Sequence, residues 1–277
     1  MIEPQRNESL AKLQNIELKT LKQIKRICEA ENIRYFIIGG TLIGALRHEG
    51  FIPWDDDVDI GIPRSDYNRF VKVAKSYLPD NYEVRTMDSS RTYKCYYTRV
   101  VDNNMKILWD HGQYKAEIGV WTDVFPLDGL PSGKLRRKMH VFHLNFIKAL
   151  YKFTQIDNVS TNVRRSRIEQ ALIRFAMITR IGKLFNGDKL LKKLDRTLQK
   201  YDFDKCEYMF NYSGCYKDRE IAPRSFFDGV QTVRFEDALV AAPSGADGYL
   251  RNVYGDYMQL PPPEKQVSHH VIITFEN

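Results

Sequence analysis

Residues 35–67 limit the folds open to this chain more than any other stretch, because they join an apolar strand pattern, a glycine turn and an acidic strand pattern. Residues 35–38 form an apolar run with the length and composition of a buried strand. The Gly-Gly-Thr sequence at 39–41 follows, and residues 42–47 have a helical pattern. After a turn, residues 55–62 alternate acidic and apolar side chains as a strand does. This order predicts a phosphate-binding turn beside a platform of carboxylates, and together they indicate phosphoryl transfer.

The glycine turn predicts contacts with phosphate. Gly39 and Gly40 permit close backbone approach, and the helix that follows offers free N–H groups and the positive end of its dipole. Thr41 adds a hydroxyl donor, and Arg47 and His48, at the far end of the helix, can contact a diphosphate or the acceptor. The alternative is a plain turn beside a surface acidic loop. It would account for either motif alone, but it is the weaker interpretation of both in order.

The acidic strand pattern predicts a metal site. Side chains alternate along a strand, so Asp55, Asp57 and Asp59 are expected on one face, with Asp56 pointing the other way as a weaker candidate. Cα atoms two residues apart lie roughly 6.6 Å from each other at ~3.3 Å per residue. Carboxylates at that spacing can converge on Mg²⁺, which prefers oxygen ligands and commonly keeps substrate phosphates as others.

A third acid is expected from a neighbouring strand, and Asp123 is the candidate because it interrupts the apolar run at 119–125. Burying a carboxylate there is costly without a cation or hydrogen-bond donors. The alternative is a salt-bridged or edge-exposed aspartate. Asp128 follows in the predicted turn at 126–129, where local hydrogen bonding explains it, so a structural role is expected.

Composition places the chain among globular proteins and favours anionic partners. The 277 residues carry a formal net charge of +7, which suits nucleotides, phosphorylated polymers, nucleic acid or an acidic membrane face without choosing among them. The sequence has no run of ~18 apolar residues, so no transmembrane helix is expected. The N-terminal residues lack a secretory pattern, and the four cysteines are scattered, so a reducing cytoplasm is expected.

The element pattern predicts an α+β fold in three segments. Residues 1–132 form the catalytic core, after an amphipathic helix over residues 9–30. Residues 133–205 form a basic helical lobe, and residues 206–277 return to strands and a last helix that complete the site. The basic runs near 136–138 and 164–167 can meet an anionic glycan precursor or lipid headgroups; a solvated helix face is the alternative.

Three motifs together resemble the LicD family within the polymerase-beta-type nucleotidyltransferase superfamily. They are IIGGTLIGALRHEGFIPWDDDVDIGIPRSDY at 37–67, VWTDVFPLDGLP at 120–131 and YLRNVYGDYMQLPPPEKQVSH at 249–269. The combination is specific and spans most of the chain, whereas the basic helical region is not diagnostic. The resemblance implies a nucleotidyltransferase-like mixed sheet flanked by helices, with the helical lobe as an addition.

The same resemblance implies a reaction. A phospho-alcohol, usually phosphocholine from CDP-choline or else a group from another CDP-alcohol, passes to a sugar hydroxyl of a teichoic acid precursor or lipopolysaccharide, and CMP leaves. Asp57 and Asp59 match the family's metal pair and Asp123 the third acid, holding one or two Mg²⁺ ions for which Mn²⁺ can substitute. Gly39–Thr41 match the phosphate loop. The implied acceptor is a glycan or a lipid-linked oligosaccharide, so the protein is expected to act in the cytoplasm at the inner face of the membrane. Nucleic acid is not expected as a partner.

A choline headgroup would need an aromatic wall for its quaternary ammonium. The aromatic candidates are Trp54, Trp109, Trp121, Tyr254 and Tyr257, of which Trp54 and Tyr257 are favoured by their place in the family motifs. Asp256 is a candidate polar contact beside the last two. Core packing is the alternative for each aromatic side chain, because large aromatics commonly fill cores.

Two other functions remain open at this point. A nucleotidyltransferase that adds a nucleotide to a small alcohol or an aminoglycoside shares the Gly-Gly and Asp-x-Asp motifs, but it would release pyrophosphate. A non-catalytic nucleotide-binding scaffold could keep the fold, although clustered carboxylates repel each other and are costly without a purpose.

Overall fold

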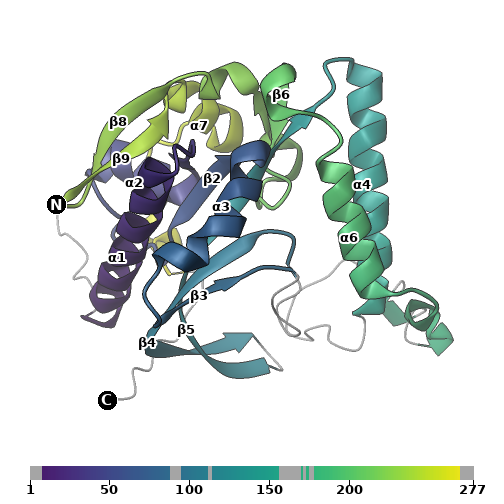
Figure 1. Cartoon of the computed structure of the whole chain (residues 1–277), viewed down its shortest axis with the longest axis horizontal. Coiled ribbons are helices and arrows are strands. Elements are labelled where there is room, and N and C mark those ends of the chain that lie inside the picture. The colour runs from purple at the N-terminus through teal and green to yellow at the C-terminus, as the bar shows by residue number, and fades with distance from the viewer. Residues whose placement is uncertain are drawn as a thin grey trace.

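The computed structural model describes residues 8–87, 95–111, 114–155, 170, 173–174 and 178–268. Within these ranges the chain forms six α-helices and a mixed sheet of seven strands, with a separate two-stranded hairpin (Figure 1). The predicted α+β class, a mixed sheet flanked by helices, is therefore confirmed. None of the helices in this part of the chain combines the length and apolar character that crossing a bilayer requires.

The first half of the chain contains α1 (Glu8–Ala30), β1 (Phe36–Ile37), α2 (Gly39–His48), β2 (Asp59–Pro63), α3 (Arg64–Tyr77), β3 (Tyr82–Arg85), β4 (Thr98–His111) and β5 (Tyr114–Leu130). The second half contains α4 (Lys134–Thr154), α6 (Gly187–Leu198), β6 (Tyr208–Phe210), β7 (Ile221–Pro223), β8 (Val230–Phe235), β9 (Ala238–Pro243) and α7 (Ala246–Tyr254). Short 3₁₀ turns lie between several of the later elements.

The sheet places the acidic residues of two strands side by side. Its strand order is β1-β2-β5-β4-β3, and β6 and β7 extend it from the end of β5. β2 and β5 run parallel, with Asp59 opposite Asp123, while the other pairs are antiparallel. Neighbours in register on adjacent strands project from the same face. The topology thus brings the two sequence motifs together.

Helix α1 packs against β4 and β5 through its apolar face. Leu21, Ile24 and Ile27 are fully buried, which confirms the predicted amphipathic helix. Burying each such side chain contributes roughly 1.5–3 kcal/mol. The helix therefore forms one wall of the core, and its position decides which side chains meet the acidic loop.

β5 continues through the Pro126–Gly129 segment that was predicted as a turn. Proline and glycine favour turns locally, but β6 pairs with Asp128, Gly129 and Leu130 and keeps the segment extended. Asp128 has the structural role that was expected, through a different contact. Arg64 Nε and Nη2 donate to its two carboxylate oxygens at 2.6 and 2.8 Å, and both residues are buried.

The basic lobe is built on a second core. α4 packs on α6, and the two helices bury Leu144, Ile147, Leu194 and Leu198 together with residues of β5 and β6. Arg64 also donates from Nη1 to Asp195 of α6 at 2.9 Å, which joins the lobe to the sheet. The division into three segments stays a prediction, and the basic run at 164–167 lies outside the described residues.

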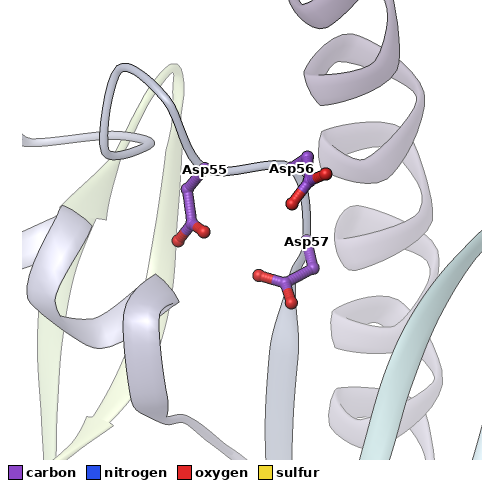
Figure 2. A group of neighbouring side chains, drawn as sticks. All are labelled: Asp55, Asp56 and Asp57. Atoms are coloured by element: carbon purple, nitrogen blue, oxygen red, sulfur yellow. The ribbon is translucent and has the colours of Figure 1, made fainter. Parts of the chain in front are cut away.

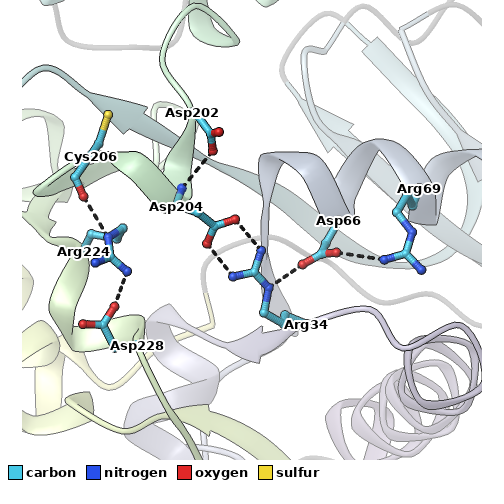
Figure 3. Close-up of polar contacts among 8 residues, drawn as sticks. All are labelled: Arg34, Asp66, Arg69, Asp202, Asp204, Cys206, Arg224 and Asp228. Atoms are coloured by element: carbon cyan, nitrogen blue, oxygen red, sulfur yellow. Dashed lines mark hydrogen bonds and ion pairs between the residues drawn. The ribbon is translucent and has the colours of Figure 1, made fainter.

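An ion-pair chain fixes the later part of the chain to the first half (Figure 3). Arg34 donates to Asp66 of α3 at 2.6 Å and, through both terminal nitrogens, to Asp204 at 2.6 and 2.8 Å. Arg69 completes the group by contacting Asp66 from the next turn of α3. The end of the lobe segment is thereby held against α3 and the residues just before β1.

Candidate active site

The three consecutive aspartates lie in a loop, not in the strand predicted over residues 55–62. β2 begins at Asp59, because its pairing with β1 covers only Ile60 and Gly61 and its ladder with β5 starts at Asp59. Strand alternation therefore does not separate the side chains before it. Carboxylate oxygens of Asp55, Asp56 and Asp57 all lie within 4.8 Å of one another (Figure 2). Asp56, expected to point away, belongs to this group.

Contacts from both ends of the chain hold this loop in place. Gln14 of α1 donates from Nε2 to the Asp55 carbonyl oxygen at 2.7 Å. Ser268, in the C-terminal segment, donates from Oγ to Asp56 Oδ2 at 2.5 Å. Asp56 is buried, whereas Asp55 and Asp57 keep partial exposure. The convergence of the three carboxylates is therefore supported by defined neighbours.

Asp59 and Asp123 stand in register on parallel strands beside this loop. Arg99 of β4 donates from Nε to Asp123 Oδ1 at 2.7 Å, and its guanidinium lies 4.5 Å from the centre of the Trp121 ring. The salt bridge considered as the alternative for Asp123 is thus present in the structure. A role for Asp123 at a metal stays a prediction, and Arg99 would fix its orientation.

Glu17 of α1 is a site residue that the sequence analysis missed. It is only 3% exposed, and its Oε2 has no hydrogen-bond partner among the described residues. It lines a cavity of about 30 Å³, room for a water molecule or a small cation, together with Asp57, Arg99 and Asp123. One signal was available: Glu17 interrupts the apolar face of α1, between Leu13 and Leu21.

The two glycines leave space for the acidic side chains. They lie inside α2, which begins at Gly39 and not after the glycine turn as predicted. Gly39 has a φ of +59°, and a Cβ there would lie 2.8 Å from Asp59 Oδ2. A Cβ on Gly40 would lie 2.5 Å from Asp55 Oδ2. Thr41 is buried, and its Oγ1 accepts a hydrogen bond from the Asp59 amide at 2.8 Å. The hydroxyl thus ties α2 to β2, and a phosphate contact by residues 39–41 stays a prediction.

The acids of the site perturb one another strongly. Burial raises the pKa of Asp59 well above its ordinary value, and the charges of Asp57 and Asp123 raise it further. Burial and nearby aspartates, Asp57 first, raise the pKa of Glu17 in the same way. Glu220, in the turn directly before β7, is also buried, and burial raises its pKa to about 7. Carboxylates that resist ionisation together are the donor set that a hard divalent cation stabilises, so the residues fit Mg²⁺.

Tyr254, at the end of α7, lies against this group. Its hydroxyl would be 3.5 Å from a Cβ on Gly39, and its ring packs edge-on against Tyr216 at 4.7 Å between centroids. Burial raises the pKa of the Tyr254 phenol, so it remains protonated and able to donate. Asp256 is exposed beyond it and has no side-chain contact with the acids among those described.

Arg47 and His48 connect α2 to the C-terminal segment. Arg47 donates from Nη1 to the Tyr257 carbonyl oxygen at 2.6 Å and from Nε to His48 Nε2 at 2.9 Å. Burial and the neighbouring guanidinium lower the pKa of His48, which keeps the imidazole neutral so that it can accept this bond. Contacts of Arg47 and His48 with substrate stay predictions, because the observed bonds are internal.

The aromatic candidates for a choline wall differ in their surroundings. Trp54 is partly exposed and packs edge-on against His48, with 6.4 Å between ring centroids. Trp121 is buried under Arg99, and Tyr257 is buried with its hydroxyl donating to Asp247 at 3.0 Å. The Trp109 side chain lies outside what the structure describes. Trp54 and Tyr254 are therefore the candidates that keep partial exposure among the described side chains.

The sequence is similar to known proteins of one family. A family profile described as LicD/FKTN/FKRP, nucleotidyltransferase domain, matches residues 32–127. The lipopolysaccharide cholinephosphotransferase LicD of Haemophilus influenzae is 30% identical over 273 residues, covering 95% of this chain and 96% of that protein. The ribitol 5-phosphate transferases FKRP of mouse and human are 48% identical over 44 residues, only 9% of their length. The first likeness extends over almost the whole chain, including the lobe and the C-terminal segment.

Proposed function

The chain belongs to the LicD family, and from this premise we propose that it transfers a phospho-alcohol, phosphocholine first among the candidates, from a CDP-activated donor to a glycan hydroxyl. The relatives' names support this class: one is a cholinephosphotransferase and the others are ribitol 5-phosphate transferases. The single observation that carries the proposal is the convergence of the Asp55, Asp56 and Asp57 carboxylates in the loop before β2, on which Asp59 stands in register with Asp123 of β5.

In the proposed reaction, the acceptor oxygen forms a bond to the phosphorus that carries choline, and the bond from that phosphorus to CMP breaks. Asp57 and Asp59 would hold Mg²⁺, which supplies positive charge to the phosphoryl oxygens when bound. Asp123, oriented by Arg99 at 2.7 Å, would accept the proton of the acceptor hydroxyl. The N-terminus of α2 would favour an anionic group through its unpaired amides and the helix dipole.

The decisive experiment follows the products. The purified protein is incubated with Mg²⁺, a panel of CDP-alcohols including CDP-choline and CDP-ribitol, and candidate glycan acceptors, and CMP and pyrophosphate are both measured. We expect CMP and choline phosphate attached to the acceptor. Pyrophosphate in place of CMP would instead identify the chain as a nucleotidyltransferase, and tight binding of CDP-choline by calorimetry without turnover would identify a scaffold.

Substitutions test the assigned residues. Asp57→Asn and Asp59→Asn should each lower kcat/KM by about 10³-fold, roughly 4 kcal/mol of transition-state stabilisation. Asp80→Asn is the matched control, because Asp80 is exposed in the loop between α3 and β3. If the two site variants release CMP as fast as the control, the residue assignment is wrong.

A further inference from the structure

Helix α4 carries an apolar stripe that faces away from the protein. Its members share high exposure, from 53% to 73%, and are Leu135, Met139, Phe142 and Phe146. Their spacing of four, three and four residues keeps them on one face of a helix with 3.6 residues per turn. The opposite face buries Leu144 and Ile147 against the core of the lobe. The exposed stripe is therefore additional to the packing face.

All the charged side chains of this helix are basic. The 21 residues of α4 include six lysines and arginines and no acidic residue. Arg137 lies over the Tyr208 ring at 3.9 Å, and Lys148 lies over Tyr212 at 4.7 Å, so these two cations face the protein. The remaining ones are exposed on both sides of the stripe and at the two ends of the helix, namely Lys134, Arg136, Lys138 and Lys152.

Helix α6 extends this charge alongside the stripe. A groove of about 830 Å³ runs between the two helices, and Met139 of the stripe is one of its lining residues. The groove's cationic lining residues are Arg136, Lys189, Lys193, Arg196 and Lys200, and no acidic side chain lines it. Asp195 of α6 faces the opposite way and accepts a hydrogen bond from Arg64. The result is a continuous apolar and cationic surface.

We propose that this surface, formed by α4 and the groove-lining face of α6, docks on a bilayer of anionic phospholipids. A helix with phenylalanine and leucine on one face and cations on its flanks lies in the plane of the interface. Long lysine and arginine side chains can cover the apolar stripe with their stems while their charges reach the headgroups. Each cation near an anionic surface strengthens binding by roughly fivefold.

Charge decides against a second copy of the chain as the occupant. A two-fold symmetric contact would place the same patch on both sides of the interface. Two copies of α4 would then bring four exposed lysines and arginines against four others, without an acid on either helix. An anionic lipid surface supplies the complementary charge. The proposal rests on α4 and α6 alone and does not depend on the reaction proposed above.

Vesicle co-sedimentation of the full chain tests this proposal. Vesicles of phosphatidylcholine alone are compared with equimolar phosphatidylcholine and phosphatidylglycerol, at low and high salt. We expect binding to the acidic vesicles that falls with salt. The double variants Leu135→Gln/Phe142→Gln and Arg136→Glu/Lys193→Glu should each weaken it at least about tenfold. Because all four side chains are exposed, melting temperatures should stay unchanged.

Matched controls come from other surfaces of the molecule. Val230→Gln/Leu239→Gln removes two apolar side chains that are 57% and 62% exposed on the β8–β9 hairpin. Lys19→Glu/Lys265→Glu reverses two exposed charges, one on α1 and one in the C-terminal segment. The proposal is overturned if the unmodified chain does not bind acidic vesicles, or if controls and lobe variants lose binding equally. A dimer in light scattering that Leu135→Gln/Phe142→Gln dissociates, without vesicle binding, would assign the surface to a second copy.

Discussion

Replacing Gly39 with alanine tests whether the start of α2 is shaped around the Asp59 carboxylate. Gly39 has a φ of +59°, which a residue with a Cβ rarely adopts. The new methyl group would stand 2.8 Å from Asp59 Oδ2, well inside van der Waals contact. The carboxylate would have to rotate away, because the Asp59 backbone is fixed by its amide hydrogen bond to Thr41 at 2.8 Å and by pairing opposite Asp123. The substitution should therefore displace a proposed metal ligand.

Gly39→Ala should lower stability only slightly and activity much more. A left-handed backbone at a non-glycine residue costs about 1–2 kcal/mol. For 277 residues the entropy of unfolding is roughly 0.6 kcal/mol/K, so the melting temperature should fall by only about 2–4 °C. A misplacement approaching 1 Å can cost about 10²-fold in rate. Gly39→Ala should thus remain folded at the assay temperature while kcat/KM for CMP release falls by about 10- to 100-fold.

Gly255→Ala provides the control for backbone strain. Gly255 has a φ of +78°, but nothing lies within 4 Å of the position of its Cβ. The variant should lose stability to a similar or larger extent and keep kcat/KM within about threefold. Thermal unfolding and CMP release are measured on both proteins. If Gly39→Ala turns over normally, or if both variants lose the same activity, the contact with Asp59 does not shape the site.

Three further outcomes follow from the structure. Arg64→Met leaves the buried Asp128 without its cation and should destabilise the protein by about 3–5 kcal/mol in urea unfolding, with Arg64→Met/Asp128→Leu recovering most of the loss. Glu220, with its pKa raised to about 7, holds a proton in the folded state that the unfolded chain has released above its ordinary value of 4.5. Unfolding free energy should therefore fall by about 1.4 kcal/mol per pH unit between these values, and urea titrations of Glu220→Gln should lack this slope. Mg²⁺ at about 100 times its Kd should add roughly 2.7 kcal/mol, some 4–5 °C of melting temperature, and Asp57→Asn but not Asp80→Asn should lose that shift.

The fold could be predicted from sequence where the signals are local. Helical periodicity gave α1 within one residue of its observed start, and the apolar run at 35–38 contains β1. The predicted turn at 126–129 was wrong because its proline and glycine are local turn signals, whereas the strand there is stabilised by β6, about eighty residues later. Pairing between distant segments leaves no mark in the composition of either one.

The contacts of individual side chains were harder to predict from the sequence than the helices and strands. Arg64 precedes Asp128 by 64 residues, and only the parallel arrangement of β2 and β5 brings them together. Asp123 was expected as a third acid, but its partner Arg99 is on β4 in a strand pattern with several cations nearby. A contact between two charged residues depends on strand order, and strand order follows from packing of the whole chain.

The geometry of the acidic loop depends on residues outside its sequence motif. In a strand, Asp56 would point away from Asp55 and Asp57, and the three carboxylates could not converge. Pairing that starts only at Asp59 leaves them in a loop, where Gln14 of α1 and Ser268 hold two of them. Both of these partners lie outside residues 32–127, the part that the family profile matches. The acids alone are therefore insufficient to define the site, because the N-terminal helix and the C-terminal segment fix their geometry.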